Sequence, residues 1–527
     1  MHLIIYTMRL FTVIAYLITC SINVFPQITE VIIDDTGNPN EPSVCFSENG
    51  DSLLYVAANI TNFYTINTSN GIIRKQKASS PLGVYGDPVL HWAKSSLYYT
   101  HLSKTPKKDY GDWFDRIVVQ RIDSAHPWKE KSYSLGYNKG KMQDKPWLSS
   151  DDWSVKYQNN IYVTWTEFDK YGSSDPTDHS RIRFAALNSK NDSFSQAITI
   201  SDTVGNCEDG DNTLEGATTA VDASGNLYAV WAGLGNIYFD QSNDGGKTWG
   251  QDRIVALQVK GWDMDMPNIM RANGMPFLVA DKIRESLYIC WADERNGNAD
   301  IWLLASKDLG KTWSEPILLN LDKTNTHQYF PNMAVDEHTG DVHVAYYDFK
   351  TSPTNTFYTI SLATYTTDGK VTNAQLTPFV TALPGKKVFY GDYLDLALYN
   401  DQLAVAYTAY DLSQKTEIKL VTEATISNGI FSKLAINNTV AIVRNSDTAQ
   451  IILNVEHPHK TKMVIHVEKN GKKSKHSYKA LYRGSNTSWD HILGVINIEP
   501  EAHIYRIKYR IRDLAVRNVY RRKIQLN

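Results

Sequence analysis

From Tyr85 onward the sequence repeats one pattern: a polar residue beside Pro or Gly, then an alternating apolar strand that ends in aromatic residues. Six copies begin at Tyr85-Gly-Asp87-Pro88, Asp144-Lys-Pro146-Trp147, Glu215-Gly-Ala217, Asp265-Met-Pro267, Tyr329-Phe-Pro331 and Tyr390-Gly-Asp392-Tyr393. The aligned aromatic residues Tyr99, Trp165, Trp231, Trp291, Tyr346 and Tyr407 follow at intervals of 66, 66, 60, 55 and 61 residues. A four-stranded blade needs about 40 residues, and loops supply the rest. The pattern predicts six blades that close into a propeller, because a stack of hairpins would leave many strand edges open.

The regions on either side of the repeat differ from it. Residues 22–80 predict a leading segment with one or two strands, which closes the ring or covers its mouth. After about residue 425 the repeat stops, so we place the propeller at residues 81–430. Residues 438–527 alternate well and resemble a small immunoglobulin-like β-sandwich.

Composition and charge agree with an all-β chain of more than one domain. The 527 residues include 31 Tyr and 13 Trp, and long amphipathic helical runs are hard to find. Residues 441–527 carry 17 Lys and Arg against 7 Asp and Glu, although the whole chain has a net charge of −3. The C-terminal part is therefore basic and the rest of the chain is acidic. These opposite signs favour a separate basic C-terminal domain, whose charges are most simply on the solvated sides of strands.

The N-terminus predicts export. Arg9 precedes the apolar run Leu10 to Ile18, which is too short for a comfortable membrane span, so residues 1–21 are interpreted as a signal peptide. A lipid anchor at Cys20 is the less favoured alternative, since Thr19 is unusual before an acylated cysteine. We therefore expect a secreted or cell-surface protein with no membrane span in the mature chain.

Two stretches share one turn signature, Ser242-x-Asp244-x-Gly246-x-Thr248-Trp249 and Ser306-x-Asp308-x-Gly310-x-Thr312-Trp313. In a hairpin turn the Asp can bind backbone N–H groups, Gly tolerates positive φ, and Trp fills the space beneath. These stretches resemble the Asp boxes, or BNR repeats, of the sialidase superfamily, which implies a β-propeller fold. In that family the Asp box lies on the outer hairpins, away from the catalytic centre, so it says little about the reaction. The stretch from Gly261 to Pro276 is similar to secreted bacterial sialidase-like proteins of unassigned specificity.

If each copy begins the innermost strand of a blade, the entering residues meet around one axis. The candidate catalytic residues at these positions are Asp87, Asp144, Glu215, Asp265 and Asp392. Carboxyls at close quarters have divergent pKa values, which lets one act as an acid and another as a base or nucleophile. Glycoside hydrolysis needs such a pair.

Other residues near these positions are candidates for substrate binding. Aromatic rings can stack on sugar faces, and basic groups can hold a hydroxyl or a carboxylate. The candidates are Tyr85, Trp147, Trp262, Arg271, His327 and Tyr390. The duller alternative is that Asp before Pro starts a turn and that the aromatic residues fill blade cores.

The resemblance covers the fold rather than the sialidase reaction. True sialidases hold a substrate carboxylate with three arginines, the first in a Phe/Tyr-Arg-Ile-Pro motif, whereas the expected place here reads Val84-Tyr85-Gly86-Asp87-Pro88. Arg271, Arg284 and Arg295 are the testable candidates for such a trio. An acidic channel would repel an anionic sugar.

Two functions from different classes remain open. One is an exported glycoside hydrolase acting on a neutral or weakly charged glycan. The other is a non-catalytic propeller that binds glycan or protein. No cofactor is required; Ca²⁺ is a candidate for the acidic cluster Glu208, Asp209, Asp211, Asn212 and Glu215, which lacks EF-hand spacing. No HExxH, GxSxG or P-loop motif and no nucleic-acid module is present, so a carbohydrate or glycoconjugate is the expected partner.

Overall fold

The computed structural model describes residues 27–424, apart from 35, 105–112, 123–127, 129–130, 351, 353–356, 378–380, 384, 390 and 411–414, and the strands between residues 437 and 526. The predicted signal peptide, Cys20 and Tyr390 lie outside the described residues. No helix with the length and hydrophobicity of a membrane span occurs in this described part of the chain.

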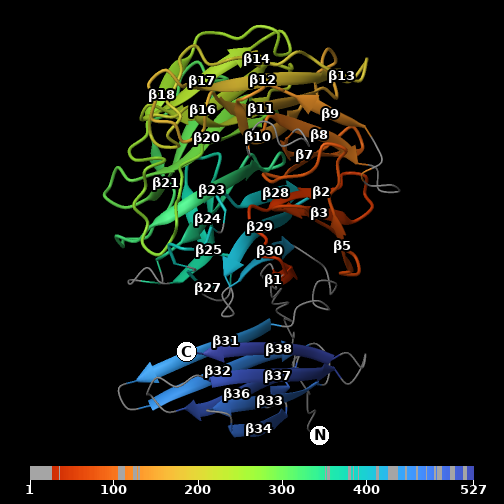
Figure 1. Ribbon diagram of the computed structural model, residues 1–527, viewed down its shortest axis with the longest axis vertical. Coiled ribbons are helices and arrows are strands. Elements are labelled where there is room, and N and C mark those ends of the chain that lie inside the picture. Colours follow the sequence, from red (N-terminus) through yellow and green to blue (C-terminus); the bar gives the residue numbers. More distant parts are fainter. Residues whose placement is uncertain are drawn as a thin grey trace, which may run out of the picture.

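Seven antiparallel sheets make up the propeller, so the prediction of six blades is wrong (Figure 1). Blade 1 contains β2 (Ser43–Phe46), β3 (Leu53–Ala58), β4 (Asn62–Asn67) and β5 (Ile73–Lys77). Residues expected to be a leading segment therefore form a full blade. The strand β3 ends in Val56-Ala57-Ala58 rather than in an aromatic residue, and this departure hid the copy from the aromatic alignment.

The next five blades follow in chain order. Blade 2 contains β6 (Val89–Ala93), β7 (Ser96–Ser103), β8 (Arg116–Ile122) and β9 (Ser132–Leu135). Blade 3 contains β10 (Met142–Ser150), β11 (Ile161–Phe168), β12 (Ser180–Asn188), β13 (Ser193–Phe194) and β14 (Ile198–Thr199). Blade 4 contains β15 (Glu215–Val221), β16 (Leu227–Gly233), β17 (Asn236–Ser242) and β18 (Arg253–Leu257). Blade 5 contains β19 (Phe277–Asp281), β20 (Ser286–Asp293), β21 (Asp300–Ser306) and β22 (Ile317–Leu318). Blade 6 contains β23 (Gln328–Val335), β24 (Val342–Asp348), β25 (Phe357–Tyr365), β26 (Val371–Gln375) and β27 (Thr381–Ala382).

The two ends of the propeller sequence share blade 7. Its strands β28 (Asp395–Tyr399), β29 (Gln402–Tyr410) and β30 (Thr416–Ala424) are completed by β1 (Gln27–Asp34), which pairs antiparallel with β30 (Figure 1). The innermost strands are neighbours in the order β2, β6, β10, β15, β19, β23 and β28, and β28 also contacts β2. The ring is therefore closed by hydrogen-bonded strands from both ends of the sequence.

Buried aromatic residues fill the spaces between blades. The aligned residues Tyr99, Trp165, Trp231, Trp291, Tyr346 and Tyr407 are all nearly inaccessible to solvent. Burying one such side chain stabilises the fold by about 1.5–3 kcal/mol. The repeated aromatic position thus marks the blade cores.

The two signature turns have matching hydrogen bonds. Asp244 accepts the N–H and the hydroxyl of Thr248 at 2.9 and 2.7 Å, and Asp308 accepts those of Thr312 at 2.9 and 2.6 Å. Gly246 has a φ of +84°, and a Cβ there would lie 2.3 Å from the Phe184 ring. Both turns lie at the ends of β17 and β21, away from the innermost strands.

The C-terminal strands form two further four-stranded antiparallel sheets, in the orders β31-β32-β36-β35 and β34-β33-β37-β38. Their strands are β31 (Asn437–Asn445), β32 (Thr448–His457), β33 (Thr461–Lys469), β34 (Lys472–Lys479), β35 (Tyr482–Arg483), β36 (Asp490–Ile498), β37 (Tyr505–Asp513) and β38 (Val519–Leu526). The immunoglobulin-like identity of this region stays a prediction.

Asp34 locks the closing strand β1 to blade 1, which generates a stability prediction. Its buried carboxylate accepts hydrogen bonds from Tyr64 and Lys75 of blade 1 and, at 2.9 Å, from the Thr36 N–H. Burial opposes ionisation, but the hydrogen bonds from Lys75, Tyr64 and Thr36 outweigh it and lower the pKa of Asp34. Asp34→Asn should cost about 1–3 kcal/mol of unfolding free energy at pH 7. The exposed Asp401→Asn is the matched control.

The pH dependence of this loss tests its cause. A carboxyl whose pKa is lowered by folding contributes stability above its unfolded pKa of about 3.9 and loses it as the pH falls through the folded value. The difference between wild type and Asp34→Asn, measured by urea unfolding, should therefore shrink below about pH 4. A difference that stays constant between pH 3 and 7 would contradict the proposed lock.

Candidate functional site

A cavity of about 740 Å³ opens where the innermost strands of blades 1, 2, 3 and 7 begin. We call it the hub cavity. Its charged lining residues are Glu41, Lys75, Lys77, Asp87, Asp144, Lys145, Arg271 and Asp392. Its polar and aromatic lining includes Asn38, Asn40, Asn59, Asn62, Tyr85, Phe114, Tyr171 and Phe389. Carboxyls and amides from distant parts of the chain thus face one solvent-filled space.

Left-handed backbone at the start of the innermost strands aims these side chains into the hub. Glu41, Asp87 and Lys145 have φ values of +49°, +49° and +47°, and Gly216 has +68°. Strands β10 and β15 also change register at Asp144 and Glu215, as a β-bulge does. Bulges redirect side chains, and non-glycine residues at positive φ are uncommon and concentrate at functional sites.

Lys145 is the centre of the charge network. Its ammonium nitrogen lies 3.5 Å from Asp144 Oδ2, 3.6 Å from Glu215 Oε2 and 3.4 Å from Asp392 Oδ2. These three carboxyls come from blades 3, 4 and 7. The Lys145 side chain is 4% exposed, and the ammonium lies 5.6 Å from the centre of the Trp262 ring. A single buried cation therefore joins three blades.

Arg271 is the second cation of the hub. Its guanidinium binds both oxygens of Asp392, with Nε 2.8 Å from Oδ1, and donates from Nη1 to Asp209 Oδ2 at 2.9 Å. The Tyr171 hydroxyl also donates to Asp209 Oδ2. Burial opposes ionisation of Asp209, but Lys145, Arg271 and the Tyr171 hydrogen bond outweigh it, so the pKa of Asp209 is lowered.

Glu41 and Asp87 are joined through an amide. Asn59 Nδ2 donates to the Glu41 carboxyl, and Asn59 Oδ1 accepts the Asp87 N–H at 2.8 Å. The Lys145 backbone N–H is 3.3 Å from Asp87 Oδ2 and 3.0 Å from Asp144 Oδ1. The Asp87 and Asp144 carboxyls therefore lie beside the same backbone nitrogen.

Acidic groups outnumber cations in the hub, and the pKa values of three of these acids are raised. Burial, Asp392 and Asp144 raise the pKa of Glu41 to about 8, against the opposing effect of Lys145 and Arg271. Burial and then Glu41 and Asp144 raise the pKa of Asp87 well above its usual range. Burial and Asp209 do the same to the pKa of Glu215. The hub therefore combines carboxyl groups whose pKa values are raised with carboxyl groups that Lys145 and Arg271 contact.

The structure brings Asp87, Asp144, Glu215 and Asp392 together, as the repeat predicted. Glu215 contacts Lys145 but does not line the hub cavity, and both of its oxygens are buried without a hydrogen bond in the described residues. The expectation that Asp265 joins them is wrong. Its side chain is 86% exposed and pairs with Lys386 at 3.3 Å. The reason is that Met264 and Met266 on either side are buried, so Asp265 points outward, and β19 begins only at Phe277.

The predicted substrate-binding residues divide between the hub and the core. Tyr85 and Arg271 line the hub cavity. Trp147 does not; it packs on the rings of Phe277 and Tyr393 at 5.0 and 5.8 Å. Trp262 is buried against Lys145. His327 accepts the Ala299 N–H at 3.2 Å outside the cavity, and burial lowers its pKa. The two Trp residues and His327 are therefore corrected from substrate contacts to packing positions.

Sequence reasoning missed Glu41, Asn59, Asp209 and Tyr171 as hub residues. Glu41-Pro42 does match the polar residue beside Pro that starts other copies, and it precedes strand β3 at Leu53–Ala58. That signal could have identified the seventh copy. Asn59, Asp209 and Tyr171 lie outside the repeated position, so no local pattern marks them.

Two other expectations fail on geometry. Arg284 binds Asp281 at 3.1 Å and Arg295 binds Asp293, so neither joins Arg271 in a trio. In the acidic cluster proposed for Ca²⁺, Asp211 Oδ1 accepts the N–H groups of Trp262 and Asp263 at 2.8 and 3.2 Å. No group of three or more His, Cys, Asp or Glu side chains suited to a metal occurs among the described residues.

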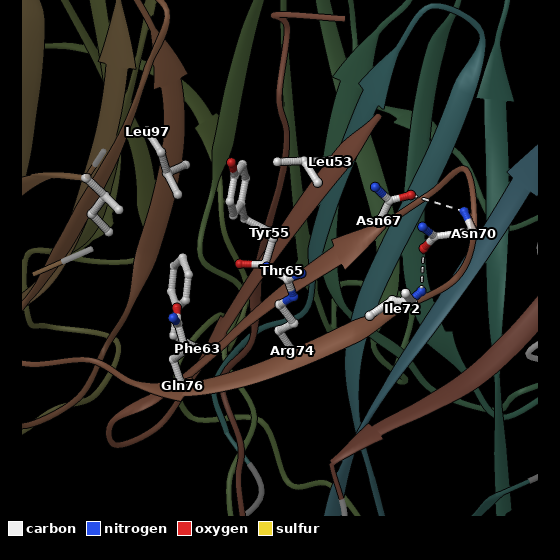
Figure 2. Close-up of a pocket in the computed structure, with 11 residues that line it drawn as sticks. Leu53, Tyr55, Phe63, Thr65, Asn67, Asn70, Ile72, Arg74, Gln76 and Leu97 are labelled. Atoms are coloured by element: carbon white, nitrogen blue, oxygen red, sulfur yellow. Dashed lines mark hydrogen bonds between the residues drawn. The ribbon is translucent and has the colours of Figure 1, made fainter. Parts of the chain in front are cut away.

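A second cavity, of about 290 Å³, lies between blades 1 and 2 (Figure 2). We call it the blade 1–2 cavity. It is lined by Leu53, Tyr55, Phe63, Thr65, Asn67, Asn70, Ile72, Arg74, Gln76, Leu97 and Ile122. It contains no carboxyl group, so it offers no acid–base pair.

Removal of Lys145 should expose how strongly the hub depends on one charge. Lys145→Met leaves buried carboxyls without their cation, which typically costs about 3–5 kcal/mol. The pKa values of these carboxyls should then rise above their unfolded values, so the variant should lose stability as the pH rises. Urea unfolding between pH 5 and 8 should show a growing deficit. Lys307→Met, at an exposed turn position, is the control; an equal deficit in both variants would contradict the hub assignment.

Replacing Glu215 should have the opposite effect on the unfolding free energy from replacing Lys145. Because folding raises its pKa, Glu215 contributes most stability below its unfolded pKa of about 4.3 and loses it as the pH rises. Glu215→Gln cannot ionise, so its unfolding free energy should increasingly exceed that of wild type from pH 5 to 9. A variant that is less stable than wild type at every pH would show that Glu215 is a needed carboxylate.

Comparison with known proteins leaves the family open. No family model matches the chain, and no curated protein matches it. Among solved structures, Trypanosoma rangeli sialidase matches with a TM-score of 0.38 and 10% identity, over 95% of this chain and 89% of that one. A structure described as NanB plus Optactamide gives 0.40 and 7%, over 75% and 94%. The polysaccharide lyase Uly1 gives 0.36 and 11%, over 90% and 99%. These TM-scores are too low to support an argument about activity, so function is argued from the chain's own residues.

Proposed function

We propose that this chain is a sialidase-like glycoside hydrolase that cleaves a glycan in the hub cavity. One arrangement carries the proposal: Glu41 and Asp87, whose pKa values are raised, line the same cavity as Asp144 and Asp392, which Lys145 and Arg271 contact. When their surroundings push the pKa values of two neighbouring acids apart, one carboxyl can donate a proton while the other stays ionised. Glycosidic bond cleavage requires both groups at once.

The contacts suggest a division of roles. Glu41 and Asp87 are the proton donors, since both line the cavity and both have raised pKa values. Asp144 is the base or nucleophile. Its closest cation contact is the 3.5 Å approach of Lys145, so its oxygens are held less tightly than those of Asp392, which Arg271 contacts at 2.8 Å. Asp392 is bound on both oxygens by Arg271, so we assign it to fixing the two cations. Glu215 lies beneath the cavity and supports Lys145.

The neutral lining supports a polyhydroxylated ligand. Asn38, Asn40, Asn59 and Asn62 place amide groups around the opening, and Tyr85 provides an aromatic face. Amides both donate and accept hydrogen bonds, as sugar hydroxyls do. Export of the chain, on the predicted signal peptide, would place it where extracellular glycans occur.

A non-catalytic glycan-binding or protein-binding propeller is the second candidate. It is favoured by the ion pairs of Asp209 and Asp392, which commit two hub carboxylates to Arg271. Under this alternative the amide-rich opening is the recognition surface and the acidic network is its support.

Turnover of a panel of aryl glycosides and complex glycans tests the proposal. Asp87→Asn, Glu41→Gln and Asp144→Asn should each lower kcat by about 10²–10⁴-fold, the usual contribution of a proton-transfer group. Asp265→Asn, which removes an exposed carboxyl outside the cavity, should leave kcat unchanged. If Glu41 is the donor, activity should fall above about pH 8, because its proton is then lost.

The panel also separates the two candidates. Binding of a glycan without turnover of any substrate would favour the non-catalytic propeller. Full activity in both Asp87→Asn and Glu41→Gln would remove the assigned proton donors.

A further inference from the structure

The strand β5 connects the two cavities. Successive side chains of a strand point to opposite faces. Accordingly Arg74 and Gln76 line the blade 1–2 cavity (Figure 2). Lys75 and Lys77 line the hub cavity. Residues 74–77 are all exposed. One edge strand therefore separates two solvent-accessible spaces and presents basic side chains to both.

The blade 1–2 cavity combines an apolar floor with a rim of hydrogen-bond donors. Tyr55, Phe63 and Leu97 form the buried floor (Figure 2). At the rim, the Asn67 side-chain oxygen accepts the Asn70 N–H at 3.0 Å, and the Asn70 side-chain oxygen accepts the Ile72 N–H at 3.0 Å. Because the turn uses both carboxamide oxygens, the amide nitrogens are the polar groups left to meet a ligand.

Two cations of β5 lack an acidic partner among the described residues. No acidic residue lines the blade 1–2 cavity, and neither Arg74 nor Lys77 has a carboxylate partner within the described part of the chain. Lys75 differs, since it is paired with Asp34 and lies 2.7 Å from the Thr36 hydroxyl. Arg74 and Lys77 are three residues apart on one strand, about 10 Å. Two unpaired cations at this spacing suit an extended ligand that carries repeated negative charges.

We propose that the blade 1–2 cavity is an anchoring site for an anionic glycan, whose chain crosses β5 toward the hub cavity. Arg74 binds a carboxylate or sulfate group on one sugar, the floor packs against the face of its ring, and Lys77 binds the next negative group. Arg binds planar oxyanions through two N–H groups, which suits either source of charge. The inference rests on the proposed function but replaces the neutral or weakly charged glycan expected from the sequence, because the anchoring cations lie on β5 and no acidic residue lines the blade 1–2 cavity in the described part of the chain. It concerns binding rather than cleavage.

Isothermal titration calorimetry of the full chain tests the site with three probes. Oligogalacturonate carries carboxylates, dextran sulfate oligosaccharides carry sulfates, and dextran oligosaccharides are neutral. Arg74→Gln and Lys77→Gln should each weaken binding of an anionic probe about tenfold, the value of one charge-assisted hydrogen bond. Binding should weaken with added salt. Lys307→Gln removes an exposed cation elsewhere and should have no effect, and thermal unfolding of each variant checks the fold.

The outcomes separate this proposal from its alternatives. An Arg74-dependent response to oligogalacturonate identifies a carboxylate glycan, and one to the sulfated probe identifies a sulfated glycan; either supports the site. Binding that Arg74→Gln and Lys77→Gln leave unchanged assigns the interaction to another basic surface and overturns it, as does equally tight binding of dextran. This readout is binding of a probe and does not depend on turnover. The anchoring site can therefore stand even if no turnover is found.

Discussion

The buried ammonium of Lys145 is the interaction on which the hub depends. It lies within 3.6 Å of carboxyl oxygens from blades 3, 4 and 7, and the residues that carry these oxygens are separated by up to 248 positions in the sequence. Burying a charge costs several kcal/mol unless partners compensate it, so Lys145 and its carboxyls are stable only together. Since Asp392 belongs to the blade that the N-terminal strand β1 completes, closure of the ring and assembly of the site are physically coupled.

The fold itself supplies most of the site geometry. The first residue of an innermost strand lies at the rim of the channel, and left-handed backbone at Glu41, Asp87 and Lys145 directs three charged side chains into it. At the junction of blades 7 and 1, Gly391 has a φ of +109°, and a Cβ there would lie 2.9 Å from Glu41. A larger residue would push blade 7 away from Glu41, so glycine at this position permits the close approach that brings Glu41 and Asp392 into one cavity.

The repeat predicted the propeller and four of its hub acids, because strand alternation and Pro or Gly at strand starts are local properties of the sequence. It failed where local properties were absent or misleading. Blade 1 lacks the aromatic residue at the end of β3, so six copies were counted instead of seven. Asp265 shares the local pattern, yet burial of Met264 and Met266 turns it outward. Asp209 and Tyr171 reach the hub through loops, whose paths depend on packing across blades rather than on periodicity.

The position of the charges indicates that the hub does more than stabilise the fold. Elsewhere on the innermost strands the contacts serve packing: Trp147 packs on Phe277 and Tyr393, and Asp395 accepts hydrogen bonds from Ser43 and Asn332 at 2.7 and 2.8 Å. Replacing a buried ion network with apolar residues of similar volume is often neutral or stabilising, so stability alone does not require the four carboxyls that line the hub cavity. The network lies where the hub cavity opens, and folding raises the pKa values of Glu41 and Asp87 there. Acids with raised pKa values that line an open cavity are suited to proton transfer to a bound ligand, a role that packing alone does not need.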